Sequence, residues 1–315
     1  MSDTNIGFVG LGNVGAKVAN NIINNGYKLY VHDLDKKKSK NLVSKGGIFC
    51  KSIEELVPKV SILITCLPSP KSVKDVLLKC IPLFNESHLW IEMSTTDEND
   101  MKYLSKLVLD KKAEVIEAPI TGGQHRAESG NISILAGGSR ESFERSFPIL
   151  SCLGHQILHC GDIGKASTLK VVTNYLASIN LLALGEALMV CKKYGIDLKT
   201  AFEGIKISSG NSFVHETESK VILNGSYDVG FTMDLVCKDV GLFDKLTKKY
   251  EIPAELSSLM LEIFQRGREK LGDRALSTSI VKLLEENCND NLRASGFPSF
   301  LEDKNQKQEA EEITI

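Results

Sequence analysis

The residues Ile6-Gly7-Phe8-Val9-Gly10-Leu11-Gly12-Asn13-Val14-Gly15 decide the fold of the first half of this chain. An apolar run leads into three glycines at the spacing Gly-x-Gly-x-x-Gly, and a helical pattern follows from Val14 to Asn25. Gly10 permits a tight turn, Gly12 lets a ligand approach the backbone, and Gly15 lets the helix pack closely on the strand. A strand, a glycine turn and a helix in this order predict the first unit of a doubly wound α/β sheet.

The rest of the first half repeats this alternation. Short apolar runs are separated by longer stretches of helical period, such as Lys71 to Lys79, and this pattern is typical of a parallel sheet covered by helices. The expected strands are Ile6–Gly10, Lys28–Asp33, Ile62–Cys66, Leu89–Met93, Val115–Glu117, Ile132–Ala136 and Gln156–Cys160.

Asp33 indicates that the glycine turn binds a ligand. It ends the second expected strand, where a carboxylate accepts hydrogen bonds from an adenosine ribose. The same carboxylate repels a 2′-phosphate, and the loop after it contains the lysines 36–38 but no arginine. We therefore expect NAD as the cofactor, with NADP less favoured. The pyrophosphate would lie at the helix N-terminus, against the glycine loop formed by Gly10, Leu11, Gly12, Asn13, Val14 and Gly15.

The second half has a different periodicity. Ala166 to Lys193 reads as one long helix, and only helical periodicity follows until about Asn289. The last residues are polar, and we expect them to form a mobile tail. The predicted organisation is a Rossmann-type dinucleotide-binding domain (1–162), an interdomain helix (163–193), an all-α domain (194–291) and a polar tail (292–315).

The composition excludes several classes of protein. The 38 basic and 40 acidic residues give a net charge of −2, without the basic excess typical of nucleic-acid binding. The N-terminal residues lack the features of a secretion signal, and we expect a cytoplasmic protein with no membrane segment. The eight cysteines and six histidines are scattered without metal-ligand spacing, so we expect no metal site.

Two further segments carry candidate chemistry. The first, Glu117-Ala118-Pro119-Ile120-Thr121-Gly122-Gly123, ends a strand in a glycine pair whose backbone can face an anion. The second, residues 161–174, opens the long helix and places Lys170 and Asn174 four residues apart, hence on one helix face. A lysine inside an apolar helix needs a reason, because burial of an unpaired ammonium is costly. The spacing alone is compatible with an interface salt bridge or with a catalytic role.

With these motifs in order, residues 5 to 290 resemble the β-hydroxyacid dehydrogenases, typified by 3-hydroxyisobutyrate dehydrogenase. Members of that family combine a glycine fingerprint, a segment like residues 117–123, a glycine-rich lead into a catalytic lysine with asparagine four residues on, and a later Lys-Asp pair. In this chain that last pair is Lys238-Asp239.

The resemblance implies an oxidoreductase that transfers a hydride between NAD and a small 3-hydroxy acid, with Lys170 as the general acid and base. It implies that the all-α domain (194–291) serves substrate binding and dimerisation, in a homodimer or homotetramer with the active site between the domains. The remaining roles that it implies are positioning by Asn174, carboxylate binding by Thr121, Gly122 and Gly123, a pocket wall at Phe231, and cofactor contacts from Leu67, Pro68, Thr95, Lys238 and, where the family commonly has asparagine, Ser72.

Other departures concern substrate geometry. Val14 stands where the family usually has methionine, and Ala166 where it usually has a third glycine. Asn211 and Phe213 stand near positions where the archetype has arginine and tryptophan. Two alternatives therefore stay open. One is an NADPH-dependent reductase of a small aldehyde acid, such as glyoxylate or succinic or tartronate semialdehyde, and the other is a catalytically silent dinucleotide-binding module.

Overall fold

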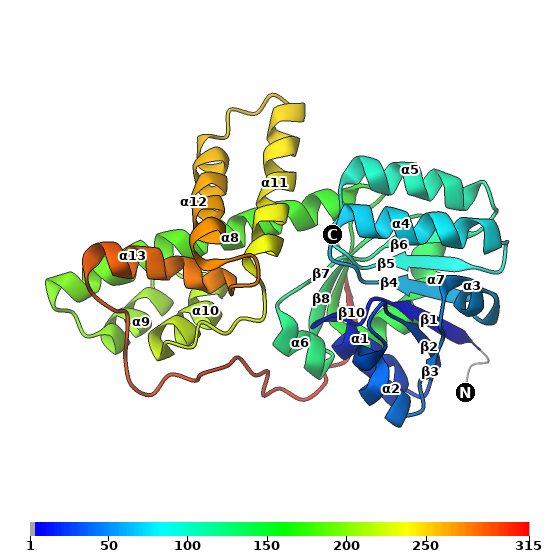
Figure 1. The fold of residues 1–315 in the computed structure, drawn as a ribbon, viewed down its shortest axis with the longest axis horizontal. Helices are drawn as coiled ribbons and strands as arrows, with labels where there is room; N and C mark the ends of the chain where they lie inside the picture. Colours follow the sequence, from blue (N-terminus) through cyan, green and yellow to red (C-terminus); the bar gives the residue numbers. More distant parts are fainter. Residues whose placement is uncertain (1–3, 315) are drawn as a thin grey trace. The chain divides into compact units, whose positions relative to one another are not determined.

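The computed structural model describes residues 4–314 and divides the chain into two compact units (Figure 1). The first unit extends to Lys170 and includes the chain again from Asp303, and the second is Val171–Glu302. The first unit is an α/β sheet structure, and the second is helical apart from one isolated bridge, Thr232 to Leu276, within its described residues. The expected fold class is therefore confirmed.

The sheet places the glycine loop at a topological switch point. Its strand order is β10-β9-β8-β6-β5-β4-β1-β2-β3, with β7 beside β8. β1 pairs in parallel with both β2 and β4, so the chain moves outward in opposite directions from β1. Ligands of open α/β sheets bind at such a point. The bounds are β1 (Asn5–Val9), β2 (Lys28–His32), β3 (Ile48–Phe49), β4 (Ile62–Thr65), β5 (Leu89–Glu92), β6 (Glu114–Glu117), β7 (Ile120–Thr121), β8 (Ile132–Gly138), β9 (Gly154–His159) and β10 (Glu311–Ile313).

Helices cover both faces of this sheet. α1 and α7 pack on one face through buried side chains such as Ile22 and Phe143, and α4 and α5 pack on the other through Leu77 and Leu104. Because both faces are covered, the central strands are apolar throughout, as parallel strands in doubly wound folds are. The helices of this unit are α1 (Gly15–Asn24), α2 (Lys40–Ser44), α3 (Ile53–Leu56), α4 (Pro70–Cys80), α5 (Glu98–Leu109), α6 (Gln124–Ser129) and α7 (Arg140–Leu153).

The long helix α8 (Lys165–Tyr194) begins in the first unit and continues into the second. Its length and composition alone would allow it to cross a membrane, and a third of that apolar window is buried. Leu184 and Leu188 of α8 join the core of the second unit, together with Phe202 and Phe264. The helices that follow are α9 (Leu198–Lys206), α10 (Phe213–Asn224), α11 (Met233–Lys249), α12 (Glu255–Leu271) and α13 (Val281–Cys288).

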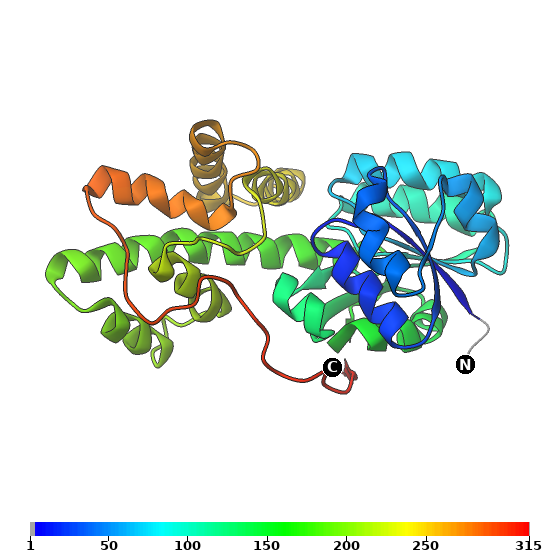
Figure 2. The same ribbon diagram turned by 60° about the horizontal axis from the view of Figure 1, so that its bottom comes forward.

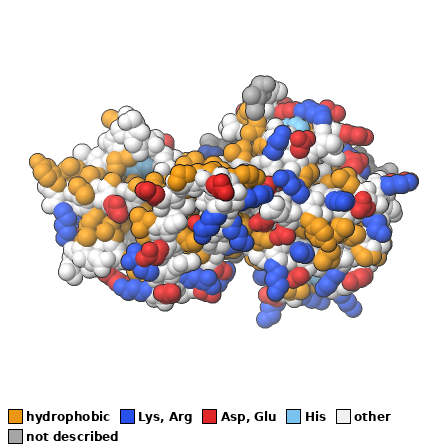
Figure 3. All heavy atoms as spheres, turned by 90° about the horizontal axis from the view of Figure 1, so that it is seen from above, with side chains coloured by type: hydrophobic (Ala, Val, Ile, Leu, Met, Phe, Trp, Pro, Cys, Tyr) orange, Lys and Arg blue, Asp and Glu red, His pale blue; other side chains and the backbone are white. Residues whose placement is uncertain are grey.

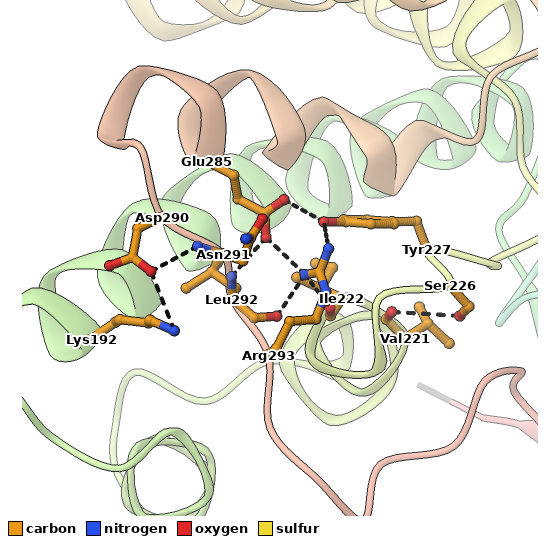
Figure 4. A network of polar contacts seen from close by, with 10 residues as sticks. All are labelled: Lys192, Val221, Ile222, Ser226, Tyr227, Glu285, Asp290, Asn291, Leu292 and Arg293. Atoms are coloured by element: carbon orange, nitrogen blue, oxygen red, sulfur yellow. Dashed lines mark hydrogen bonds and ion pairs between the residues drawn. The ribbon is translucent and has the colours of Figure 1, made fainter.

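A buried polar network fixes the end of the helical unit (Figure 4). The guanidinium of Arg293 donates to the Tyr227 hydroxyl at 2.6 Å and to Glu285 Oε1 at 2.8 Å, and that hydroxyl donates to the other oxygen of Glu285. Tyr227 and Glu285 are 1% and 5% exposed, and burial raises the pKa of the Tyr227 phenol. Leu292, fully buried, donates its backbone N–H to Glu285. The chain therefore leaves the second unit from a fixed point.

The C-terminal residues differ from the mobile tail that we expected. β10 pairs in parallel with β9, and Figure 2 shows this red segment beside the first unit's sheet. Arg140 forms two hydrogen bonds to Glu312, and Asn131 donates to Asp303 and accepts from the backbone of Gln308 at 2.8 Å. Without β10, β9 would be an edge strand with unpaired backbone groups. The three residues of β10 pair with these groups, and polar side chains of the same segment add the contacts above. The sequence did not predict this strand, because the segment has few apolar residues.

Charge is distributed without a dominant sign on the face shown in Figure 3, where Lys and Arg side chains alternate with Asp and Glu. Surface ion pairs form within one unit, such as that of Lys17 with Glu128 at 2.6 Å. Exposed pairs of this kind contribute little to stability.

Removal of residues 303–315 should destabilise the first unit. The deletion exposes the edge of β9 and leaves Arg140 and Asn131 without their partners on this segment, so we expect the melting temperature to fall by about 5 °C, equivalent to roughly 2 kcal/mol. Scanning calorimetry measures this directly. Glu309→Ala, which alters only an exposed side chain of the same segment, is the control. A deletion variant that melts with the full chain would contradict a structural role for β10.

Candidate functional site

The glycine loop is closed around two of its glycines and open at the third. Gly10 has a φ of +100°, and a Cβ on it would lie 2.3 Å from the carbonyl oxygen of Cys66. A Cβ on Gly15 would lie 2.1 Å from the oxygen of Gly10. A Cβ on Gly12 would meet nothing within 4 Å. The backbone is therefore open to a ligand at Gly12, next to the start of α1, which has no side-chain cap and no acidic residue in its first turn. These features fit a dinucleotide pyrophosphate.

Asp33 is held at the rim of this loop. Its Oδ2 accepts from the backbone N–H of Leu11 at 2.7 Å, and its Oδ1 accepts from that of Asp35 at 2.8 Å. Its side chain is 11% exposed, and the ammonium of Lys38 lies 3.6 Å from Oδ1. A carboxylate and a lysine therefore lie together just after β2, beside the glycine loop. The sequence prediction singled out Asp33 and gave Lys38 no definite role.

The loops after β4 and β5 are joined by a buried carboxylate. Glu92, which is fully buried, accepts from the N–H of Ser94 at 2.6 Å and from the hydroxyl of Thr65. Ser94 in turn accepts from the N–H of Leu67 at 2.8 Å. Burial raises the pKa of Glu92 to about 7, against the opposing effect of these hydrogen bonds. The network sets the path of the segments that contain Leu67, Pro68 and Thr95.

Ser72 lies in the first turn of α4. Its hydroxyl is 2.9 Å from that of Ser69, which caps the helix by accepting from the N–H of Ser72. Ser72 therefore has a structural contact at the start of α4, and this contact comes in addition to any role beside a cofactor.

Thr121, Gly122 and Gly123 form a turn that requires glycine. β7 ends at Thr121, and Gly122 and Gly123 have φ values of +116° and +86°. A Cβ on Gly122 would lie 3.2 Å from Cδ of Arg126, and one on Gly123 would lie 2.9 Å from the ring of His125. The turn is partly exposed, so its backbone is accessible to a small ligand.

Lys170 is 7% exposed and lies on the face of α8 that also contains the buried residues Ala166 and Ser167. The start of this helix is bound to Glu117, at the end of β6. Glu117 Oε1 accepts from the N–H groups of Gly164 at 2.7 Å and Ala166 at 2.9 Å, and its Oε2 accepts from the Ser167 hydroxyl. Burial raises the pKa of the Glu117 carboxyl. Glu117 begins the segment 117–123 that the sequence singles out, but its contact with α8 was not predicted.

Asn174 and Lys238 meet at Asp239 in the second unit. The amide of Asn174 donates to Asp239 Oδ2 at 2.5 Å, and the ammonium of Lys238 lies 2.7 Å from Oδ1. Asp239 is 2% exposed, so its charge is balanced by Lys238 and the orientation of Asn174 is fixed. The sequence prediction gave Asp239 no role of its own, although the Lys-Asp pair had signalled it.

Phe231 precedes α11 in the same unit. It is partly buried and packs against the core of the helical unit, and its carbonyl accepts from the N–H of Ser277 at 2.8 Å. Across residues 4–314, no group of three or more His, Cys, Asp and Glu side chains has the arrangement of a metal site.

Two known protein families match successive parts of this chain. The family described as the NAD binding domain of 6-phosphogluconate dehydrogenase matches residues 5–161, and that described as "NAD-binding of NADP-dependent 3-hydroxyisobutyrate dehydrogenase" matches residues 164–284. The chain is 30% identical to 2-(hydroxymethyl)glutarate dehydrogenase of Eubacterium barkeri, over 89% of this chain and 95% of that protein. It is 31% identical to the mitochondrial 3-hydroxyisobutyrate dehydrogenase of Drosophila melanogaster, over 87% of each.

A solved structure shares the fold. The 3-hydroxyisobutyrate dehydrogenase of Mycobacterium tuberculosis superposes with a TM-score of 0.82 at 24% identity, over 89% of this chain and 99% of the other. Two matched families that together span most of the chain, and relatives matched over nearly their full length, identify it. The chain belongs to the 3-hydroxyisobutyrate dehydrogenase-like family of β-hydroxyacid dehydrogenases.

Proposed function

We propose that this NAD(P)-dependent hydroxyacid dehydrogenase uses NAD to oxidise a small 3-hydroxy acid, and that Lys170 is its general acid and base. The observation that carries the proposal is the burial of Lys170 at 7% exposure on α8, in a chain that belongs to a dehydrogenase family. A lysine at such a position is a candidate for proton transfer rather than for surface solvation.

The reaction divides between cofactor and protein. When bound, NAD would supply the acceptor for the hydride of the hydroxyl-bearing carbon. The amine of Lys170 takes the hydroxyl proton in oxidation, and the ammonium returns a proton to the carbonyl oxygen in reduction. Its positive charge also stabilises negative charge that develops on this oxygen. Asn174, oriented by Asp239, would hold the substrate or the lysine in place.

The substrate class follows from the two relatives. 3-Hydroxyisobutyrate and 2-(hydroxymethyl)glutarate, after which they are named, are both carboxylates with a hydroxymethyl group on the adjacent carbon. We propose a substrate of this class, HOCH2–CHR–COO⁻, which yields the corresponding aldehyde acid and NADH. The turn at Thr121, Gly122 and Gly123 would bind the shared carboxylate, while the substituent R would differ between enzymes.

The family resemblance also leads us to propose a homodimer or homotetramer. In the second unit, α8 exposes apolar side chains, with Leu176, Val190 and Tyr194 being 50%, 69% and 84% exposed. An exposed apolar helix face of this kind is typical of an interface. Sedimentation velocity should show an assembly larger than one chain, and a monomer at micromolar concentration would reject this proposal.

Replacement of Lys170 by alanine should remove turnover but retain NAD binding. Loss of a general acid and base reduces kcat by about 10²- to 10⁴-fold. Steady-state rates with 3-hydroxyisobutyrate and 2-(hydroxymethyl)glutarate, followed by NADH absorbance, measure the effect, and calorimetry measures the Kd of NAD. Lys165→Ala, at an exposed position of the same helix, is the matched control. Near-normal kcat in the Lys170 variant would remove this residue from the mechanism. A wild-type chain that binds NAD but turns over no hydroxy acid would be a silent binding module.

The preference for NAD should depend on Asp33. Its carboxylate bonds a ribose hydroxyl but repels a 2′-phosphate, so we expect kcat/KM with NAD to exceed that with NADP by at least about tenfold, equivalent to 1.4 kcal/mol. Asp33→Ser should reduce this ratio, whereas Asp35→Asn, two residues further on, should not. A wild-type preference for NADP would instead assign Lys38 to the 2′-phosphate and favour an NADPH-dependent aldehyde-acid reductase.

A further inference from the structure

The carboxylate of Glu117 occupies the start of α8 from within the protein. Glu117 is the last residue of β6 and is fully buried. Its two oxygens accept from the N–H groups of Gly164 and Ala166 and from the hydroxyl of Ser167. The first N–H groups of a helix have no partner within the helix, so a carboxylate at this position satisfies them and interacts favourably with the helix dipole. Here the carboxylate comes from a strand 47 residues earlier in the chain.

The surroundings leave little freedom for this carboxylate to move. Gly137 of β8 lies directly opposite Glu117 in the antiparallel pairing of β6 with β8. A Cβ on Gly137 would lie 2.4 Å from Glu117 Oε1 and 3.1 Å from Cβ of Ala166. The absence of a side chain at Gly137 therefore makes the space in which the carboxylate meets the helix.

The contact lies close to Lys170 along α8. Ala166 and Ser167 precede Lys170 by four and three residues, so all three lie on one face, and all three are buried. Any rotation or shift of the first helical turn is transmitted to Lys170, because the hydrogen-bonded helix between them is rigid. A displacement of about 1 Å at a reacting group lowers a rate by about a hundredfold.

We propose that Glu117 is a positioning residue for Lys170, because its carboxylate fixes the first turn of α8 and thereby the position of the lysine amine. The proposal rests on the function proposed above for Lys170. It assigns Glu117 no contact with substrate or cofactor. Glu92, the register partner of Glu117 on β5, accepts hydrogen bonds from Ser94 and Thr65, so the two buried carboxylates hold different segments.

The first test is a kinetic comparison of Glu117 variants. Glu117→Met keeps the bulk but removes the acceptors, and we expect kcat to fall by about 10- to 100-fold while the Kd of NAD changes less than about twofold. Glu117→Gln retains an acceptor oxygen for the two N–H groups and should keep kcat within about fivefold of the wild type. Glu114→Gln, the same change at the other end of β6 where Glu114 pairs with Arg145, should leave kcat unchanged.

A milder variant covers the case in which Glu117→Met does not fold. Ser167→Ala removes one donor to Glu117 without a large cavity, and we expect kcat to fall by about three- to tenfold with NAD binding retained. If Glu117→Met or Ser167→Ala loses no more kcat than Glu114→Gln, Glu117 does not position Lys170. If NAD binding falls in proportion to kcat, the variant has lost the folded structure of the dinucleotide-binding domain as a whole, and the proposal is wrong.

Hydrogen exchange separates this proposal from the proposed function. The amides of Gly164 and Ala166 should exchange at least about tenfold faster in Glu117→Met than in the wild type, and no faster in Glu114→Gln. A wild-type chain without dehydrogenase activity would refute the proposed function. Faster exchange in Glu117→Met, confined to the start of α8, would still show that Glu117 fixes this helical turn. Unchanged exchange in an active enzyme would overturn only the role of Glu117.

Discussion

The burial of two carboxylates inside the sheet is the constraint that shapes the first unit. Glu92 and Glu117 are register partners at the ends of β5 and β6, and both are fully buried. A buried carboxylate is costly unless hydrogen bonds replace its water, and here backbone N–H and hydroxyl groups do so. These donors belong to other segments of the chain. The hydrogen bonds that each carboxylate accepts therefore hold one such segment in place. Glu92 fixes the loops after β4 and β5, and Glu117 fixes the start of α8.

The two carboxylates also affect each other. Burial raises the pKa of both groups, and the charge of Glu117 contributes to the rise at Glu92, whose pKa reaches about 7. A raised pKa stabilises the folded state at low pH, and this contribution is lost as the pH rises through about 7. The hydrogen bonds to each carboxylate act in the opposite direction. Burial of the two carboxylates therefore requires that the N–H and hydroxyl donors stay at hydrogen-bonding distance. This favours rigid segments at the carboxyl edge of the sheet.

The parts of the structure that the sequence predicted are those governed by local sterics and periodicity. The spacing of Gly10, Gly12 and Gly15 reflects contacts among neighbouring turns, and the apolar runs marked the longer strands. The contacts of Glu117 and Asp239 join residues 47 or more positions apart, so no local pattern contains them. For Glu117, the signal in the sequence was a charged residue at the end of an apolar strand. β10 was missed for a related reason, since its partner β9 lies some 150 residues away in the chain.

The starts of α1 and α8 show how the same backbone chemistry serves two purposes. Both helices begin near the carboxyl edge of the sheet, with N–H groups that attract an anion. At α8 the anion is internal, because Glu117 bonds Gly164 and Ala166. At α1 no side chain caps the helix, no acidic residue lies in its first turn, and the backbone at Gly12 is open. An external phosphate at α8 would have to compete with a buried carboxylate, whereas at α1 it would complete the helix start. The distribution of acidic residues thus leaves the start of α1 open to an anion and fills the start of α8 with Glu117.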